Sequence, residues 1–260
     1  MDTKTKKTLR TLLILLAIPV CLKAFMHYGR AVWVPVYYSI TGQRTVKSAL
    51  YDIQFKAYNR LEPYLERVGV RYPPTGLTLI AIKDQKQLEV WFEQEKGPVF
   101  IRSYHIEAAS GDSGPKLQEG DGQVPEGIYR ITGLNPNSSY HLSMKIDYPS
   151  EFDRKMARQD GRDNLGGDIF IHGDRASAGC LAMGDEVIEE LFLLVADAGI
   201  ANVKVIIAPV DLRRTAAPLP ANAPDWVPNL YNSIERELKR YKRPGFEKDK
   251  IIRSEKGRIL

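Results

Sequence analysis

Cysteine and histidine are scarce in this chain of 260 residues, which contains two cysteines and four histidines. No HExxH or paired CxxC pattern occurs, so the sequence predicts neither a metal site nor a cofactor. Internal repeats, low-complexity segments and an apolar run of about 20 residues are also missing. These absences argue against collagen-like chains, repeat proteins and proteins with several membrane spans.

The excess of basic residues lies at the two ends of the chain. Residues 1–30 and residues 234–260 each carry a net charge of +5, whereas residues 31–233 carry −5, and the three add up to +5. A mildly acidic body does not fit nucleic acid, so no nucleic-acid partner is predicted. Basic ends fit an anionic surface, such as lipid headgroups or a cell-wall polymer.

The N-terminal segment has the layout of an export signal. Basic residues at positions 4, 6, 7 and 10 precede an apolar run from Leu12 to Leu22. This run is shorter than the roughly 20 residues of a membrane span, and no small-x-small cleavage site follows it. A retained membrane anchor, a cleaved signal and a buried N-terminal helix are the open alternatives. We expect the chain to fractionate with membranes or the cell envelope.

The central part of the chain has the pattern of a mainly β domain. Short apolar runs predict strands, and Asp185–Ala198 predicts one prominent helix that ends at Gly199. His105 and His141 fall in predicted strands, where we expect structural or surface roles. The predicted strands cover residues 77–83, 88–93, 99–107, 127–132, 140–146, 169–172 and 203–207.

Helical patterns flank this domain on both sides. Apolar residues recur at helical spacing over residues 39–70, but Pro63 interrupts them, so two short helices are predicted there. A short basic helix is predicted over residues 232–242. The fold class is therefore α+β, mainly β, with one prominent helix, a short helical N-terminal prefix and a C-terminal helix. The predicted parts are 1–38 (signal peptide or anchor), 39–75 (helical prefix), 76–210 (mainly β domain) and 211–260 (Pro-rich stretch and basic tail).

One stretch combines a strand end with two reactive side chains. The strand ends at His172, and Cys180 follows eight positions later, after a loop of small residues. Gly173 and Gly179 allow close backbone approach, the amides around Gly179 and Cys180 are candidates for an oxyanion site, and Ser177 is expected to orient the loop. A cysteine beside a histidine and just before a helix is expected to have a lowered pKa and to act as a nucleophile. The alternative is a buried structural cysteine next to a turn.

This stretch resembles the active-site signature of the L,D-transpeptidase (YkuD-like) catalytic domain family. The signature is a strand-borne His-Gly followed by Ser-x-Gly-Cys, which here are His172-Gly173 and Ser177-Ala178-Gly179-Cys180. Upstream, residues 125–131 resemble the family's Pro-x-Gly strand. Residues 148–149 and 152–154 resemble its YafK-like branch in particular.

The resemblance covers residues 77–209 and implies a YkuD-like β-sandwich catalytic domain that acts on peptidoglycan. Cys180 would attack a carbonyl of the murein stem peptide and form a thioester, while His172 would take the thiol proton and later protonate the leaving amine. An incoming amine would then give transpeptidation, and water would give hydrolysis, including release of a murein-tethered lipoprotein. Stem peptides and such a lipoprotein are the implied partners, and the cell envelope is the implied location.

Two positions depart from the family's pattern. Many members carry His two residues before the cysteine and Arg two residues after it, where this chain has Ala178 and Ala182. Loss of the arginine removes a fixed cation, so transpeptidation, hydrolysis and peptidoglycan binding without turnover are the open alternatives. Arg175 and Tyr148 are predicted to contact substrate, although Arg175 and Asp174 also fit a solvated loop.

Overall fold

The structure is a computed structural model that describes residues 15–26, 29–220 and 222–243. The basic positions 4, 6, 7 and 10 and the tail after residue 243 lie outside this part of the chain. A helix covers residues 15–26, and no helix in the described ranges is both long and apolar enough to cross a bilayer. The further elements are α2 (Arg30–Thr41), α3 (Val46–Val68), β1 (Leu77–Ile82), β2 (Gln87–Phe92), β3 (Val99–His105), β4 (Ala108–Ala109), β5 (Gly127–Ser138), β6 (His141–Ile146), α4 (Glu151–Gln159), β7 (Phe170–His172), β8 (Leu181–Ala182), α5 (Asp185–Ala198), a 3-10 turn (Ile200–Asn202), β9 (Val203–Ala208) and α6 (Val227–Leu238).

The strands form one mixed sheet of nine strands in the order β3-β2-β1-β9-β5-β6-β7-β8-β4. The pairs β1–β9 and β7–β8 are parallel, and the other neighbours are antiparallel. Strand β5 joins the two halves of the sheet, β3-β2-β1-β9 and β6-β7-β8-β4. Its first residues pair with β9, and its later residues pair with β6 across two register shifts. Such shifts bend a strand, so the halves stay continuous instead of forming two separate sheets.

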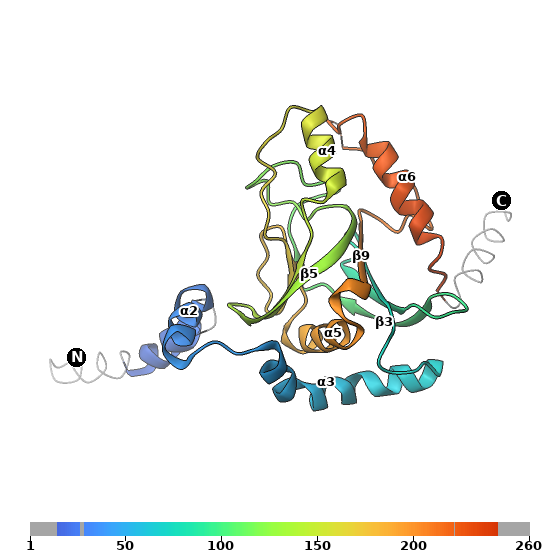
Figure 1. Cartoon of the computed structure of the whole chain (residues 1–260). Coiled ribbons are helices and arrows are strands. Elements are labelled where there is room, and N and C mark those ends of the chain that lie inside the picture. Colours follow the sequence, from blue (N-terminus) through green and yellow to red (C-terminus); the bar gives the residue numbers. More distant parts are fainter. Residues whose placement is uncertain (1–14, 27–28, 221, 244–260) are drawn as a thin grey trace, which may run out of the picture.

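Helices cover both faces of the sheet and create two apolar cores. On one face, α5 packs on the sheet and α3 packs on α5, so that Figure 1 shows α3 as an outer layer below α5. On the other face, α6 covers the parallel pair β1 and β9 together with Trp91 of β2. The predicted α+β, mainly β fold class is confirmed, and the predicted helix Asp185–Ala198 has the bounds of α5.

The prediction of two short helices before the domain was wrong, because α3 continues through Pro63. Its buried residues repeat every four positions and contact the domain on both sides of the proline; they are Ala49, Ile53, Ala57, Leu61 and Leu65. Pro63 itself is exposed, so water can satisfy the carbonyl that loses its partner. Packing therefore offsets the roughly 3 kcal/mol that proline costs inside a helix.

Two further elements differ from the sequence prediction. The connection over residues 148–167 contains α4, whose first turn is fixed by a capping box between Ser150 and Asp153. Helix α6 begins at Val227, five residues before the predicted start at 232, because Pro228 fits the first turn of a helix.

A buried carboxylate attaches α3 to the domain. Glu190 of α5 accepts hydrogen bonds from Arg60 of α3 (2.8 Å), Arg102 of β3 (3.0 Å) and the Tyr104 hydroxyl (2.6 Å). The Glu190 side chain is 3% exposed, so water cannot take the place of its carboxylate as acceptor for the three donors. This group therefore adds a buried polar attachment to the apolar packing of α3.

We expect Glu190→Gln to lower the free energy of unfolding by about 3 kcal/mol, since breaking a buried ion pair takes the counter-charge from Arg102, whereas Arg60 keeps Glu189. The exposed Glu186 on the same helix gives the matched control, and Glu186→Gln should change stability by less than about 0.5 kcal/mol. Urea unfolding followed by circular dichroism measures both. Equal effects of the two substitutions would contradict the role of Glu190.

Candidate active site

Strand β7 and the start of β8 bring the predicted pair onto one face of the sheet. The strands are parallel, with Ile171 opposite Leu181, so Cys180 lies beside Phe170 and His172 lies two residues further along. Side chains two residues apart share a face, and neighbouring residues of paired strands do as well. From strand spacing and rise, the Cα atoms of Cys180 and His172 are about 8 Å apart, which lets the side chains converge.

Cys180 is a partly exposed thiol held by backbone groups. The Phe170 N–H donates to Sγ at 3.4 Å, and Sγ lies 3.9 Å from the carbonyl oxygen of Asp168, which accepts from the thiol. Burial raises the pKa of the Cys180 thiol, and the hydrogen bond from Phe170 opposes this only in part. The prediction of a lowered pKa at a helix start was wrong, because β8 and Gly184 stand between Cys180 and α5.

His172 is a buried imidazole in a defined orientation. Its Nδ1 lies 2.6 Å from the carbonyl oxygen of Gly173, and since a carbonyl only accepts, Nδ1 carries the hydrogen. The Tyr140 ring packs on the imidazole with 4.7 Å between centroids. Burial lowers the pKa of His172, so the ring is neutral at pH 7 and Nε2 keeps a free lone pair. In the described ranges, the imidazole and the Cys180 sulfur share no hydrogen bond.

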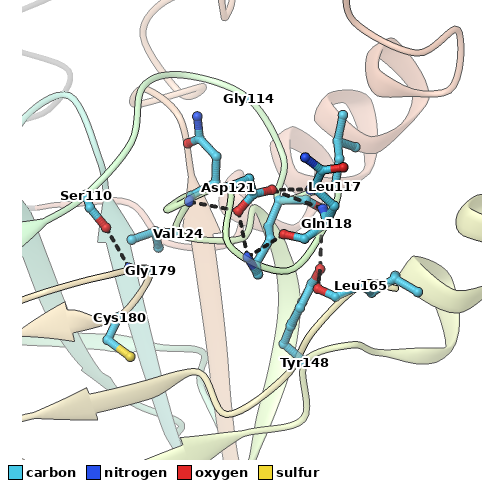
Figure 2. A network of polar contacts seen from close by, with 12 residues as sticks. Ser110, Gly114, Leu117, Gln118, Asp121, Val124, Tyr148, Leu165, Gly179 and Cys180 are labelled. Atoms are coloured by element: carbon cyan, nitrogen blue, oxygen red, sulfur yellow. Dashed lines mark hydrogen bonds and ion pairs between the residues drawn. The ribbon is translucent and has the colours of Figure 1, made fainter. Parts of the chain in front are cut away.

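The loop before Cys180 is closed by two serine hydroxyls. Ser177 Oγ accepts from the Cys180 N–H (3.2 Å) and donates to the Cys180 carbonyl (2.6 Å). The Gly179 N–H donates to Ser110 Oγ at 2.5 Å, a bond that Figure 2 shows directly above the thiol. Gly179 has φ +97°, and an added Cβ would lie 3.2 Å from the Gln123 carbonyl, so a side chain does not fit there.

A second network of hydrogen bonds, to the right of the Cys180 thiol in Figure 2, orders the loop over residues 110–124. Asp121 accepts from Lys116 Nζ (2.6 Å) and from the backbone N–H groups of three loop residues, Leu117, Gln118 and Gln123. The Lys116 ammonium favours a thiolate at Cys180, although burial outweighs it.

The two predicted substrate contacts have different surroundings. Tyr148 is 3% exposed, and its hydroxyl lies 3.2 Å from the Leu165 carbonyl and 3.4 Å from the Lys116 carbonyl. Tyr148 therefore supports the loop over residues 110–124 through the Lys116 carbonyl. The Arg175 side chain is 75% exposed and pairs with Glu107 at 3.4 Å, so it remains accessible to a charged ligand.

Two other histidines lie in the part of the chain that the structure describes. His105 is exposed, and His141 Nε2 lies 3.0 Å from a carboxylate oxygen of Glu189. Among the residues that the structure describes, no group of three or more His, Cys, Asp or Glu could hold a metal ion.

The resting pair is predicted to be a neutral thiol and a neutral imidazole, which makes thiol reactivity strongly dependent on pH. In a Cys21→Ser background, we expect iodoacetamide to alkylate Cys180 at pH 7 more slowly than N-acetylcysteine. Because the pKa is raised, the rate should still rise about tenfold per pH unit between pH 7 and pH 9. A rate that is already constant above pH 7 would show a thiolate and contradict the geometry.

Comparison with known proteins gives a family match over the region just described. The L,D-transpeptidase catalytic domain family, YkuD, matches residues 77–207. YafK of Escherichia coli K12, a curated protein named as a candidate L,D-transpeptidase, is 33% identical over 132 residues, which are 49% of this chain and 51% of that protein. The chain thus spans about half the length of the curated relatives it matches.

Solved structures with partial likeness include two further proteins. The helical cell shape determining protein Pgp2 of Campylobacter jejuni is 24% identical with a TM-score of 0.42, covering 56% of this chain and 54% of that one. Bd1075 of Bdellovibrio bacteriovorus is 18% identical with a TM-score of 0.38, covering 64% and 55%.

Proposed function

The chain belongs to the L,D-transpeptidase catalytic domain family, and on this premise we propose that it is a cysteine-dependent acyltransferase acting on the stem peptides of peptidoglycan. The observation that supports this most is the pairing of an accessible thiol, Cys180, with an imidazole on the same sheet face whose Nε2 is free. Nucleophilic catalysis at a carbonyl needs such a thiol and such a base.

In the proposed reaction, Cys180 Sγ attacks a carbonyl carbon of the stem peptide as its proton passes to His172 Nε2. The carbonyl π electrons move to oxygen and give a tetrahedral oxyanion. This intermediate collapses, the carbon–nitrogen bond breaks, and His172 gives the proton to the leaving amine. The remaining thioester is then attacked by an amine, which restores an amide, or by water, which gives a carboxylate.

The neutral state of both groups suits this sequence of proton transfers. A neutral imidazole can accept the thiol proton at pH 7, and the Gly173 carbonyl stabilises the imidazolium that results, through the Nδ1–H hydrogen bond. The thiolate then forms only as the carbonyl is attacked. A reactive thiolate is thereby avoided while no substrate is bound.

Hydrolysis is the second candidate outcome, and one position favours it. Ala182 replaces the arginine that many family members carry, and it is fully buried beside His172, so it offers no cation to an incoming acceptor. Release of a protein tethered to murein is the hydrolytic form of the proposal. Arg175 is the exposed cation of the loop and is proposed to contact the substrate's charged groups.

We also propose that the enzyme works in the cell envelope and is held at the membrane by its N-terminal segment. The support is the exposure of large apolar side chains in the helix over residues 15–26, such as Leu15, Leu16, Val20 and Leu22. Exposed apolar side chains next to a basic stretch fit a lipid surface. Fractionation of the full-length protein with and without carbonate washing tests this location.

The activity is tested by incubating the full-length chain with purified sacculi that carry tethered lipoprotein and with isolated tetrapeptide muropeptides. Mass spectrometry identifies the products, and Cys180→Ala is the control. New cross-linked or amine-exchanged muropeptides indicate transpeptidation, whereas release of lipoprotein or of a terminal residue with added water indicates hydrolysis. Saturable binding to sacculi without any Cys180-dependent product would leave a binding module as the better account.

A further inference from the structure

The Ser110 hydroxyl accepts a hydrogen bond from Gly179, the residue next to the nucleophile, although 69 positions separate the two residues in the sequence. Strand β4 pairs antiparallel with β8, and Ala109 is opposite Leu181. Continuing this register by one residue places Ser110, which follows β4, opposite Cys180, which precedes β8. Opposite residues of antiparallel strands have Cα atoms about 5 Å apart and side chains on one face.

The Ser110 hydroxyl has an unused hydrogen at this place. A serine hydroxyl can donate one hydrogen bond and accept two. Its oxygen accepts the Gly179 N–H at 2.5 Å, which turns its own hydrogen away from Gly179. In the described part of the chain, the Ser110 hydroxyl donates no hydrogen bond. The hydrogen is therefore available to a ligand.

The backbone donors around the thiol are already used. The Cys180 N–H and the Ser177 hydroxyl close a ring with the Cys180 carbonyl. The Phe170 N–H is directed at Sγ, and the Gly179 N–H is directed at Ser110. The Ser110 hydroxyl therefore keeps a hydrogen that a developing oxyanion can accept, whereas the amides of Phe170, Gly179 and Cys180 do not.

The loop that carries Ser110 is fixed at both ends by a buried ion pair. Lys83 Nζ donates to Glu126 (2.9 Å) and to the carbonyl oxygens of Gly114 and Val124 (both 3.1 Å). The Val124 N–H in turn donates to the Ser110 carbonyl at 3.3 Å. A hydroxyl held in this way needs little reorganisation when negative charge appears, which is the condition for electrostatic catalysis.

From this arrangement we infer that Ser110 is a catalytic residue whose hydroxyl donates a hydrogen bond to the oxyanion, with the Gly179 N–H polarising it from behind. The inference rests on the proposed function and names a further group for the same reaction. Ser110 forms and breaks no covalent bond. The negative charge arises as Sγ attacks the carbonyl carbon, and the hydrogen bond lasts until the amine leaves.

The test compares two reagents for the same thiol in the full-length chain with Cys21→Ser. An activated ester, p-nitrophenyl acetate, acylates Cys180 through a tetrahedral oxyanion, whereas iodoacetamide alkylates it without one. We expect Ser110→Ala to slow acylation about 10²-fold, as for loss of one oxyanion donor, and to change alkylation by less than about twofold. Ser110→Thr should recover most of the rate, and Ser113→Ala in the same loop is the matched control.

Each other outcome overturns the inference. Unchanged or faster acylation in Ser110→Ala would mean that an amide, such as that of Gly179, is the donor. A parallel loss of acylation and alkylation would mean that Ser110 only shapes the loop, which a lowered melting temperature would accompany. Wild-type acylation that equals that of Cys180→Ala would contradict the proposed function itself, whereas Cys180-dependent acylation that ignores Ser110 contradicts this inference alone.

Discussion

Replacing Cys180 by alanine is expected to lower acyl transfer from stem peptides by about 10⁴-fold or more, because no other group can form the thioester. The chain has one further cysteine, Cys21, which lies in the N-terminal apolar segment and outside the family match. The measurement is the initial rate of amine release from a tetrapeptide, together with the intact mass of the protein quenched in acid. Wild type should show the added mass of an acyl group, and the variant should show none.

The fold is expected to survive this substitution. Cys180 is partly exposed, and its sulfur makes two weak hydrogen bonds with described residues, so alanine removes little that holds the fold. Cys180→Ser is the sharper comparison, because it keeps a donor and an acceptor at the same place but has a much higher pKa than a thiol. We expect it to lose at least about 10³-fold as well. Activity within tenfold of wild type in either variant, or equal loss in Cys21→Ala, would refute Cys180 as the nucleophile.

The parts of this molecule that could be predicted are those with strong local signals. Helix α5 has apolar residues at helical spacing and a glycine at each end, so its bounds followed from the sequence. Most strands of the domain were also predicted, since their apolar runs are bounded by polar turns. The Ser-x-Gly-Cys pattern and the histidine before it identified the two candidate reactive residues, because His172 and Cys180 lie only eight positions apart in the sequence.

The parts that were missed depend on contacts between distant segments. Ser110 reaches Gly179 because β4 pairs with β8, and these strands have two residues each and leave no periodic pattern. The raised pKa of Cys180 comes from burial, which the sequence does not display. Helix α4 did leave a signal, because Ser150 and Asp153 have the spacing of a capping box.

The substitution of His172 is expected to have the second largest effect. His172→Asn keeps an N–H that can donate to the Gly173 carbonyl, as Nδ1 does now at 2.6 Å, but it removes the base at Nε2. At pH 7 we expect acyl transfer to fall about 10²- to 10⁴-fold, the range of general base catalysis. The loss should appear in kcat rather than KM, because the ring is 2% exposed and offers little surface to bind substrate.

The pH profile separates a lost base from a distorted site. Burial holds the pKa of His172 below 6.5, so wild-type acyl transfer should persist as the pH falls to that value and decline only below it, when the ring takes up a proton. In His172→Asn this acidic limb should vanish, and the rate should rise with pH as the thiol ionises unaided, which narrows the deficit above about pH 9. The exposed His105 supplies the control, since His105→Asn should leave both rate and profile unchanged. A deficit in His172→Asn that is the same at every pH would mean that His172 positions the loop instead of moving the proton.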